Sequence, residues 1–203
     1  MSGYGKGYDT SNVNVFKSGI NDDVTLVKFE LVNVDTARYQ GEACDIEWQK
    51  EGKSQTARLF PVNESTVRPR SIKEKDASGN QVERMQTEQE AIDEAYIKLN
   101  SVVKHIAGCA VTDAEWNEAQ KGTSSFADLI NNAAKLVAGK NYTGQLILGY
   151  KDKYLVVPQA MYVTKSFWSV NGRHQLVFTP KTGYFQATPP VAVQQETKED
   201  TNW

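Results

Sequence analysis

The sequence predicts an α+β protein that is mainly β, and three observations lead to this class. Apolar and polar residues alternate along short segments before residue 62, and this period of two is typical of half-buried strands. Helix-start and helix-stop residues cluster between residues 87 and 138. Strand patterns then return from residue 144 onward. The predicted order is therefore strands, helices, strands.

The first three predicted strands form an antiparallel meander. The first runs from Val24 to Val32. In the second, Cys44, Ile46 and Trp48 alternate with polar residues. The sequence Glu51-Gly52-Lys53 is a turn that leads into a third strand over residues 54–61. Before this meander, residues 1–14 are rich in small polar residues and are expected to be a flexible N-terminal arm. After it, residues 62–86 are expected to be a polar loop.

Capping residues define the helical part. Thr87 with Glu90, and Thr112 with Glu115, make two capping boxes, and Ser125 opens a third helix. Glycines stand where the three helices are expected to stop, at positions 108, 122 and 139. Residues 144–150 and 154–158 are then predicted as strands, and Asn171-Gly172 as the turn of a further hairpin.

This element order matches the OB-fold, a five-stranded Greek-key barrel. We therefore expect an OB-fold-like, five-stranded barrel over residues 15–190, with a large helical insertion, about 87–138, between strands 3 and 4. A generic α+β domain with a mixed sheet is the alternative. Residues 191–203 cannot bury a core and are expected to form an acidic, flexible C-terminal tail.

Charge is unevenly distributed along the chain. The net charge of −2 is small for 203 residues. Residues 58–75 and 140–173 are nevertheless locally basic, whereas the last ten residues are acidic. Such segregation favours a partner that is a polyanion. Cys44 and Cys109 lack metal-ligand spacing and are interpreted as reduced thiols of a cytosolic protein, and no segment is apolar enough to predict a membrane span.

Signs of catalysis are few. His105 and His174 lack a recognisable nucleophile beside them, and phosphate-binding, dinucleotide-binding, zinc and calcium motifs are missing from the sequence. We therefore expect a protein that is not an enzyme and that needs no cofactor and no metal ion.

Nucleic-acid binding finds better support, because flat side chains for stacking on bases are interleaved with cations for phosphates. We expect single-stranded DNA to bind without strong sequence preference. The alternative for the aromatic residues is that they fill the core, which is the favoured interpretation for Trp48 and stays open for Tyr154 and Phe167. The candidate DNA-binding residues are Arg58, Phe60, Arg68, Arg70, Tyr150, Lys151, Lys153, Tyr154, Lys165, Trp168 and Arg173.

The C-terminal tail is a candidate docking peptide. A mobile acidic segment that ends in an aromatic ring and a free carboxylate can bind an apolar pocket lined by basic residues. The residues that define this partner-binding tail are Glu196, Glu199, Asp200 and Trp203.

With these residues in view, the chain resembles single-stranded DNA-binding proteins of bacteriophages. The resemblance is carried by the tail and by three segments: Phe16-Lys-Ser-Gly-Ile-Asn-Asp-Asp-Val-Thr-Leu, Ser124-Ser-Phe-Ala-Asp-Leu-Ile and Gly144-Gln-Leu-Ile-Leu-Gly-Tyr-Lys-Asp-Lys-Tyr-Leu. It implies an OB-fold that coats single strands during phage replication and recombination, without a cofactor, in the cytoplasm of the bacterial host. It also implies that replication or recombination proteins bind the tail. A phage structural or assembly protein with a docking arm and tail is the second hypothesis.

Overall fold

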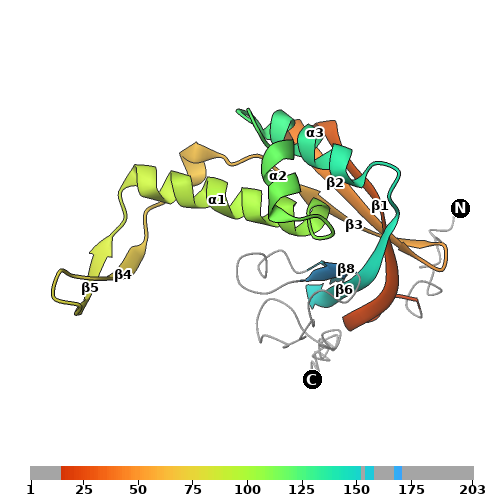
Figure 1. Ribbon diagram of the computed structural model, residues 1–203, viewed down its shortest axis with the longest axis horizontal. Coiled ribbons are helices and arrows are strands. Elements are labelled where there is room, and N and C mark those ends of the chain that lie inside the picture. The colour runs from red at the N-terminus through yellow and green to blue at the C-terminus, as the bar shows by residue number, and fades with distance from the viewer. Residues whose placement is uncertain (1–14, 152–153, 158–166, 171–203) are drawn as a thin grey trace, which may run out of the picture.

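The structure is a computed structural model that describes residues 15–151, 154–157 and 167–170 (Figure 1). Strands make up most of its regular structure, and three helices lie between the third and sixth strands in the chain. The expected α+β class, mainly β, is confirmed. The helices are α1 (Glu88–Ala107), α2 (Asp113–Ala119) and α3 (Phe126–Val137), and a short 3-10 turn spans Glu64–Thr66.

The main sheet has the strand order β3-β2-β1-β6-β7, and β8 pairs with β6 as well. Its pairs are antiparallel. The first three strands form the predicted meander. The strands are β1 (Gly19–Thr36), β2 (Tyr39–Lys50), β3 (Lys53–Leu59), β6 (Tyr142–Lys151), β7 (Tyr154–Val156) and β8 (Trp168–Val170).

The two ends of this strand order, β3 and β7, approach each other. The side-chain amide of Gln55 on β3 donates to the Leu155 carbonyl oxygen on β7, with a nitrogen–oxygen distance of 3.3 Å. The long strand β1 makes this approach possible, because it pairs with β2 along one part and with β6 along another. Its register shifts between Leu26 and Lys28 and between Asn21 and Val24, and such irregularities bend a strand. No ladder between β3 and β7 closes the sheet within the described residues.

The predicted capping boxes are both present. Thr87 and Thr112 each accept a hydrogen bond from the backbone of the glutamate three residues later, and that glutamate accepts one in return. Ser125 caps α3 by accepting from the Asp128 backbone. Gly108 follows α1 as its C-cap, and glycine fits there because a Cβ would lie 2.7 Å from the Trp116 ring.

The prediction of a polar loop over residues 62–86 was wrong. This region contains the antiparallel hairpin of β4 (Ser71–Lys75) and β5 (Gln81–Met85). Both strands are exposed on both faces apart from half-buried Ile72 and Arg84, so they lack the alternation that marks a half-buried strand. With the first half of α1, the hairpin extends away from the main sheet (Figure 1). We call residues 70–98 the arm.

The core lies between the main sheet and the helices. The C-terminal half of α1 and the apolar face of α3 supply Val103, Ile106 and Ile130, which are fully buried. The sheet supplies Trp48 and Trp168, whose ring centroids lie 6.1 Å apart. The expected N-terminal arm, the hairpin at Asn171-Gly172 and the C-terminal tail lie outside the described residues.

Candidate nucleic-acid interface

The outer face of β3 carries two of the candidate residues. Ala57 and Leu59 point inward, because they pair with buried residues of β2. Arg58 and Phe60 alternate with them and therefore face outward. Phe60 is 44% exposed, and its ring packs edge-on against Tyr39 at a centroid distance of 4.7 Å. One exposed ring and one cation thus lie next to each other on this face.

Arg58 already has an anionic partner. Its Nε donates to Asp45 Oδ1 at 2.5 Å, and its Nη2 donates to Asp45 Oδ2 at 2.9 Å. Asp45 lies directly opposite Arg58 on β2, so the sheet register itself sets this bidentate pair. The hydrogen bond from Arg58 lowers the pKa of Asp45 below its usual value. A phosphate that binds the same Nε and Nη2 groups of Arg58 must therefore displace a carboxylate.

The neighbouring charges on this face are also paired. The Lys28 ammonium lies 2.8 Å from Glu30 on β1. Glu47 on β2 accepts from the Ser54 hydroxyl at 2.5 Å, and this hydrogen bond lowers the pKa of Glu47. Both of the named cations of this outer face, Lys28 and Arg58, are thus ion-paired, and Glu47 adds a negative charge, so the face of β1 to β3 is not an open basic groove.

A second group of candidates lies at the β6–β7 hairpin. Lys151 and Tyr154 pair across it, and both are exposed, Tyr154 by 61%. Tyr142 pairs with buried Leu26 and marks the inner face of β6. The period of two then places Tyr150 on that inner face and Lys151, with Tyr154, on the outer one. Tyr150 is accordingly half-buried.

The turn between β2 and β3 lies at the same end of β3 as the contact with β7. Lys50 and Lys53 face each other across this turn, two residues before Gln55. These two cations were not among the sequence candidates. Their signal in the sequence is the lysine on each side of Glu51-Gly52, a pattern that by itself predicts only a turn.

The prediction that Trp168 stacks on bases is corrected by its burial. Trp168 and Phe167 are both fully buried. The backbone N–H of Trp168 donates to His105 Nε2 at 3.3 Å, and β8 pairs with β6 through residues 144–146. A Cβ on Gly144 would collide with the Ser169 carbonyl group, so glycine at this position allows the close approach. Both rings belong to the core.

The remaining described candidates lie at the base of the arm. Arg68 is exposed and donates through Nη1 to the carbonyl oxygens of Ser65 and Val67. Arg70 pairs with Glu94 at 2.5 Å, with its side chain 62% exposed. The β3 strand spans about 20 Å at 3.3 Å per residue, so the candidates do not converge on one spot. They follow the outer face of β3 toward the arm.

Several predicted site residues lie outside the described residues, so the structure places none of them. They are Lys153, Lys165 and Arg173 of the DNA-binding set and Glu196, Glu199, Asp200 and Trp203 of the tail. Within the described part of the chain, no group of three or more His, Cys, Asp or Glu side chains could hold a metal ion. None of the described helices is long and apolar enough to cross a bilayer.

Comparison with protein families, with curated proteins and with solved structures gave no match for this chain.

Proposed function

We propose that this chain binds single-stranded DNA without strong sequence preference, through an OB-type barrel. The strand order β3-β2-β1-β6-β7 supports the barrel, because the Gln55–Leu155 contact brings its two edge strands together. Closing a sheet requires its edges to meet in this way. The helical segment between β3 and β6 occupies the place that the OB-fold gives to its helix.

The observation that carries the proposal is the presence of two exposed rings, one at the end of β3 and one on β7, each with a cation close to it in the structure. Phe60 and Tyr154 are 44% and 61% exposed; Arg58, paired with Asp45, lies two residues before Phe60, and Lys151 pairs with Tyr154 across the β6–β7 hairpin. Rings offer π-faces to any base, and neighbouring cations attract phosphates, so the combination suits sequence-independent binding to single strands. The bases of duplex DNA are stacked and paired, so they are not accessible to such rings. We therefore expect the protein to bind duplex DNA more weakly than single-stranded DNA.

Fluorescence polarisation of labelled oligo-dT at several salt concentrations tests this proposal. We expect micromolar or tighter affinity, with log affinity falling linearly with log salt at about 0.7 per phosphate contact. An extrinsic label is needed because Trp48, Trp116 and Trp168 are buried, so base stacking cannot quench them directly. Salt-independent affinity, or equal affinity for duplex DNA, would contradict the proposal.

The wider role follows from the resemblance to phage single-stranded DNA-binding proteins. In this proposal the chain protects transient single strands during phage replication and recombination in the host cytoplasm, and its tail recruits replication or recombination proteins. Trp203→Ala should leave DNA affinity unchanged and abolish recovery of such partners in pull-downs from infected cells. Recovery of the same partners by wild type and variant would refute the tail as a docking peptide.

A phage structural or assembly protein that docks through its N-terminal arm and its tail is the second candidate, and the separate projection formed by residues 70–98 favours it (Figure 1). Such a protein would dock its arm on neighbouring subunits and leave oligo-dT unbound. Sedimentation of the protein with and without oligo-dT separates the two functions. A large assembly that forms without DNA and does not bind the oligonucleotide would favour this candidate.

A further inference from the structure

The β4–β5 hairpin of the arm contributes little to the core. Apart from half-buried Ile72 and Arg84, every side chain of both strands is exposed. A two-stranded hairpin without a packed face is marginally stable in water. Its attachment to α1 therefore has to come from other contacts.

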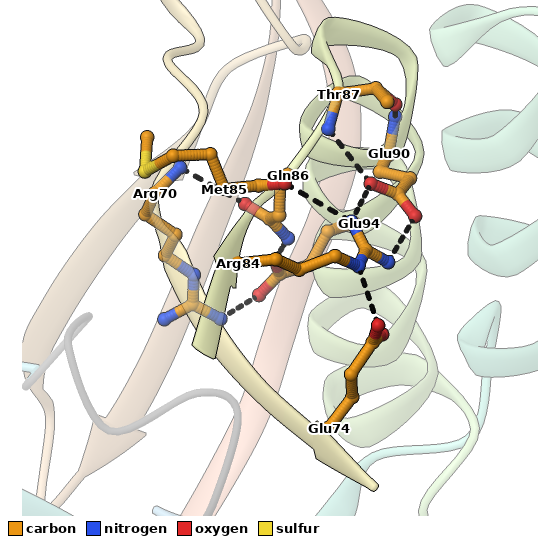
Figure 2. A network of polar contacts seen from close by, with 8 residues as sticks. All are labelled: Arg70, Glu74, Arg84, Met85, Gln86, Thr87, Glu90 and Glu94. Carbon is orange, nitrogen blue, oxygen red and sulfur yellow. Dashed lines mark hydrogen bonds and ion pairs between the residues drawn. The ribbon is translucent and has the colours of Figure 1, made fainter. Parts of the chain in front are cut away.

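Those contacts are a network of ion pairs between the hairpin and α1, drawn in Figure 2. Arg84 donates to both carboxylate oxygens of Glu90, each at 2.7 Å, and pairs with Glu74 at 2.9 Å. Arg70 pairs with Glu94 one turn further along the helix. Glu90 also closes the capping box of α1. The network links the hairpin to the first turns of the helix.

The two lysines of the hairpin take no part in this network. In the described part of the chain, Lys73 and Lys75 have no carboxylate within ion-pair distance. They share one face of β4. Met85 of β5 lies on the same face, because it pairs with Ser71, and its side chain is 60% exposed. Arg84 lies on the opposite face, the one tied to α1. Figure 2 shows Met85 pointing away from the network.

The acidic residues near these lysines accept hydrogen bonds from neutral groups and keep their charge, and Glu83 lies directly opposite Lys73 in the register of the hairpin. Glu83 shares their face and accepts from the Ser71 hydroxyl at 2.5 Å. Asp76 accepts from the backbone N–H groups of Ser78 and Asn80 and so shapes the turn. The outward face presents two ammonium groups that form no ion pair with the described residues, beside the Glu83 carboxylate and an exposed thioether. On one strand, Lys73 and Lys75 lie about 7 Å apart, which is comparable with the spacing of successive phosphates in an extended single strand.

We propose that this outward face of the arm is a second nucleic-acid contact, in which Lys73 and Lys75 bind backbone phosphates of a strand that continues beyond β3. The inference rests on the proposed function. Two further arginines in the connecting segment support it, because exposed Arg68 and Arg70, the latter paired with Glu94, stand between Phe60 and β4 in the chain. The arm thereby lengthens the segment of DNA that the protein binds. The ion pairs of Arg70 and Arg84 attach the hairpin to α1.

Two lengths of oligo-dT test this inference on the full chain. One is about 6 nucleotides long, within the range that a single OB-fold binds, and the other is about 20. Lys73→Gln/Lys75→Gln should leave the affinity for the short oligonucleotide unchanged. For the long one, the slope of log affinity against log salt should fall by about 1.4, since each lost phosphate contact removes about 0.7.

The matched control is Lys135→Gln/Lys140→Gln, which removes two exposed lysines at the far end of α3. Its slope should equal that of the wild type for both oligonucleotides. Unchanged slopes in the arm variant, with normal binding of the short oligonucleotide, would overturn this inference alone. A change in self-association with an unchanged slope would overturn it in favour of a protein interface. Failure of the wild type to bind either oligonucleotide would overturn the proposed function together with it.

Discussion

Alanine substitutions at Trp168 and Tyr154 separate the core role of one ring from the binding role of the other. Trp168 is fully buried and packs near Trp48. Removing such a ring costs about 3–5 kcal/mol, which for a chain of this size lowers the melting temperature by about 6–20 °C. Tyr154 is 61% exposed, so its loss should change stability by less than about 0.5 kcal/mol. It should weaken oligo-dT binding by about 1–3 kcal/mol, or about 5- to 150-fold.

Thermal melting by circular dichroism and polarisation with the short oligonucleotide provide the two measurements. Binding is measured well below the melting temperature of each variant, so that unfolding does not imitate lost affinity. Tyr96→Ala is the control, because Tyr96 is 47% exposed but lies on α1, away from β3. If Tyr154→Ala binds like wild type while remaining folded, the outer face is not a stacking surface. If Trp168→Ala melts like wild type, the ring is not part of the core.

Three further perturbations test the charges and caps. Asp45→Asn should free Arg58 for phosphates and raise oligo-dT affinity severalfold, and Asp45→Asn/Arg58→Gln should abolish that gain; a gain that persists in the double variant would refute the competition. The pKa values of Glu90 and Glu94 are lowered to about 2 by hydrogen bonds from Arg84 and Lys98 respectively, so the arm network is fully formed above pH 4.5 and is lost as the pH falls toward 2. The protection of the β4 and β5 amides against hydrogen exchange, taken relative to the intrinsic exchange rate at each pH, should fall over that range, and unchanged protection would contradict it. Thr87→Ala should lower the free energy of unfolding by about 1 kcal/mol in urea titrations.

The sequence by itself determined the elements whose signals are local. A capping box joins residues three positions apart, so Thr87 with Glu90 and Thr112 with Glu115 could be recognised without knowing the fold. The alternation of Cys44, Ile46 and Trp48 likewise reflects one buried face, and it correctly predicted β2 and the burial of Trp48. The order of strands, helices and strands follows from such local patterns, and the structure confirms it.

Only the tertiary structure decided which aromatic rings are buried and which cations are paired. Trp168 and Tyr154 lie in similar basic and aromatic sequence, yet β8 pairs along β6 and takes Trp168 into the core while Tyr154 stays exposed. Arg58 and Asp45 are 13 positions apart and meet only through the register of β2 with β3. The β4–β5 hairpin escaped prediction because its contacts are ionic and distant in sequence rather than periodic. Burial and charge pairing depend on long-range neighbours, and local patterns do not specify these.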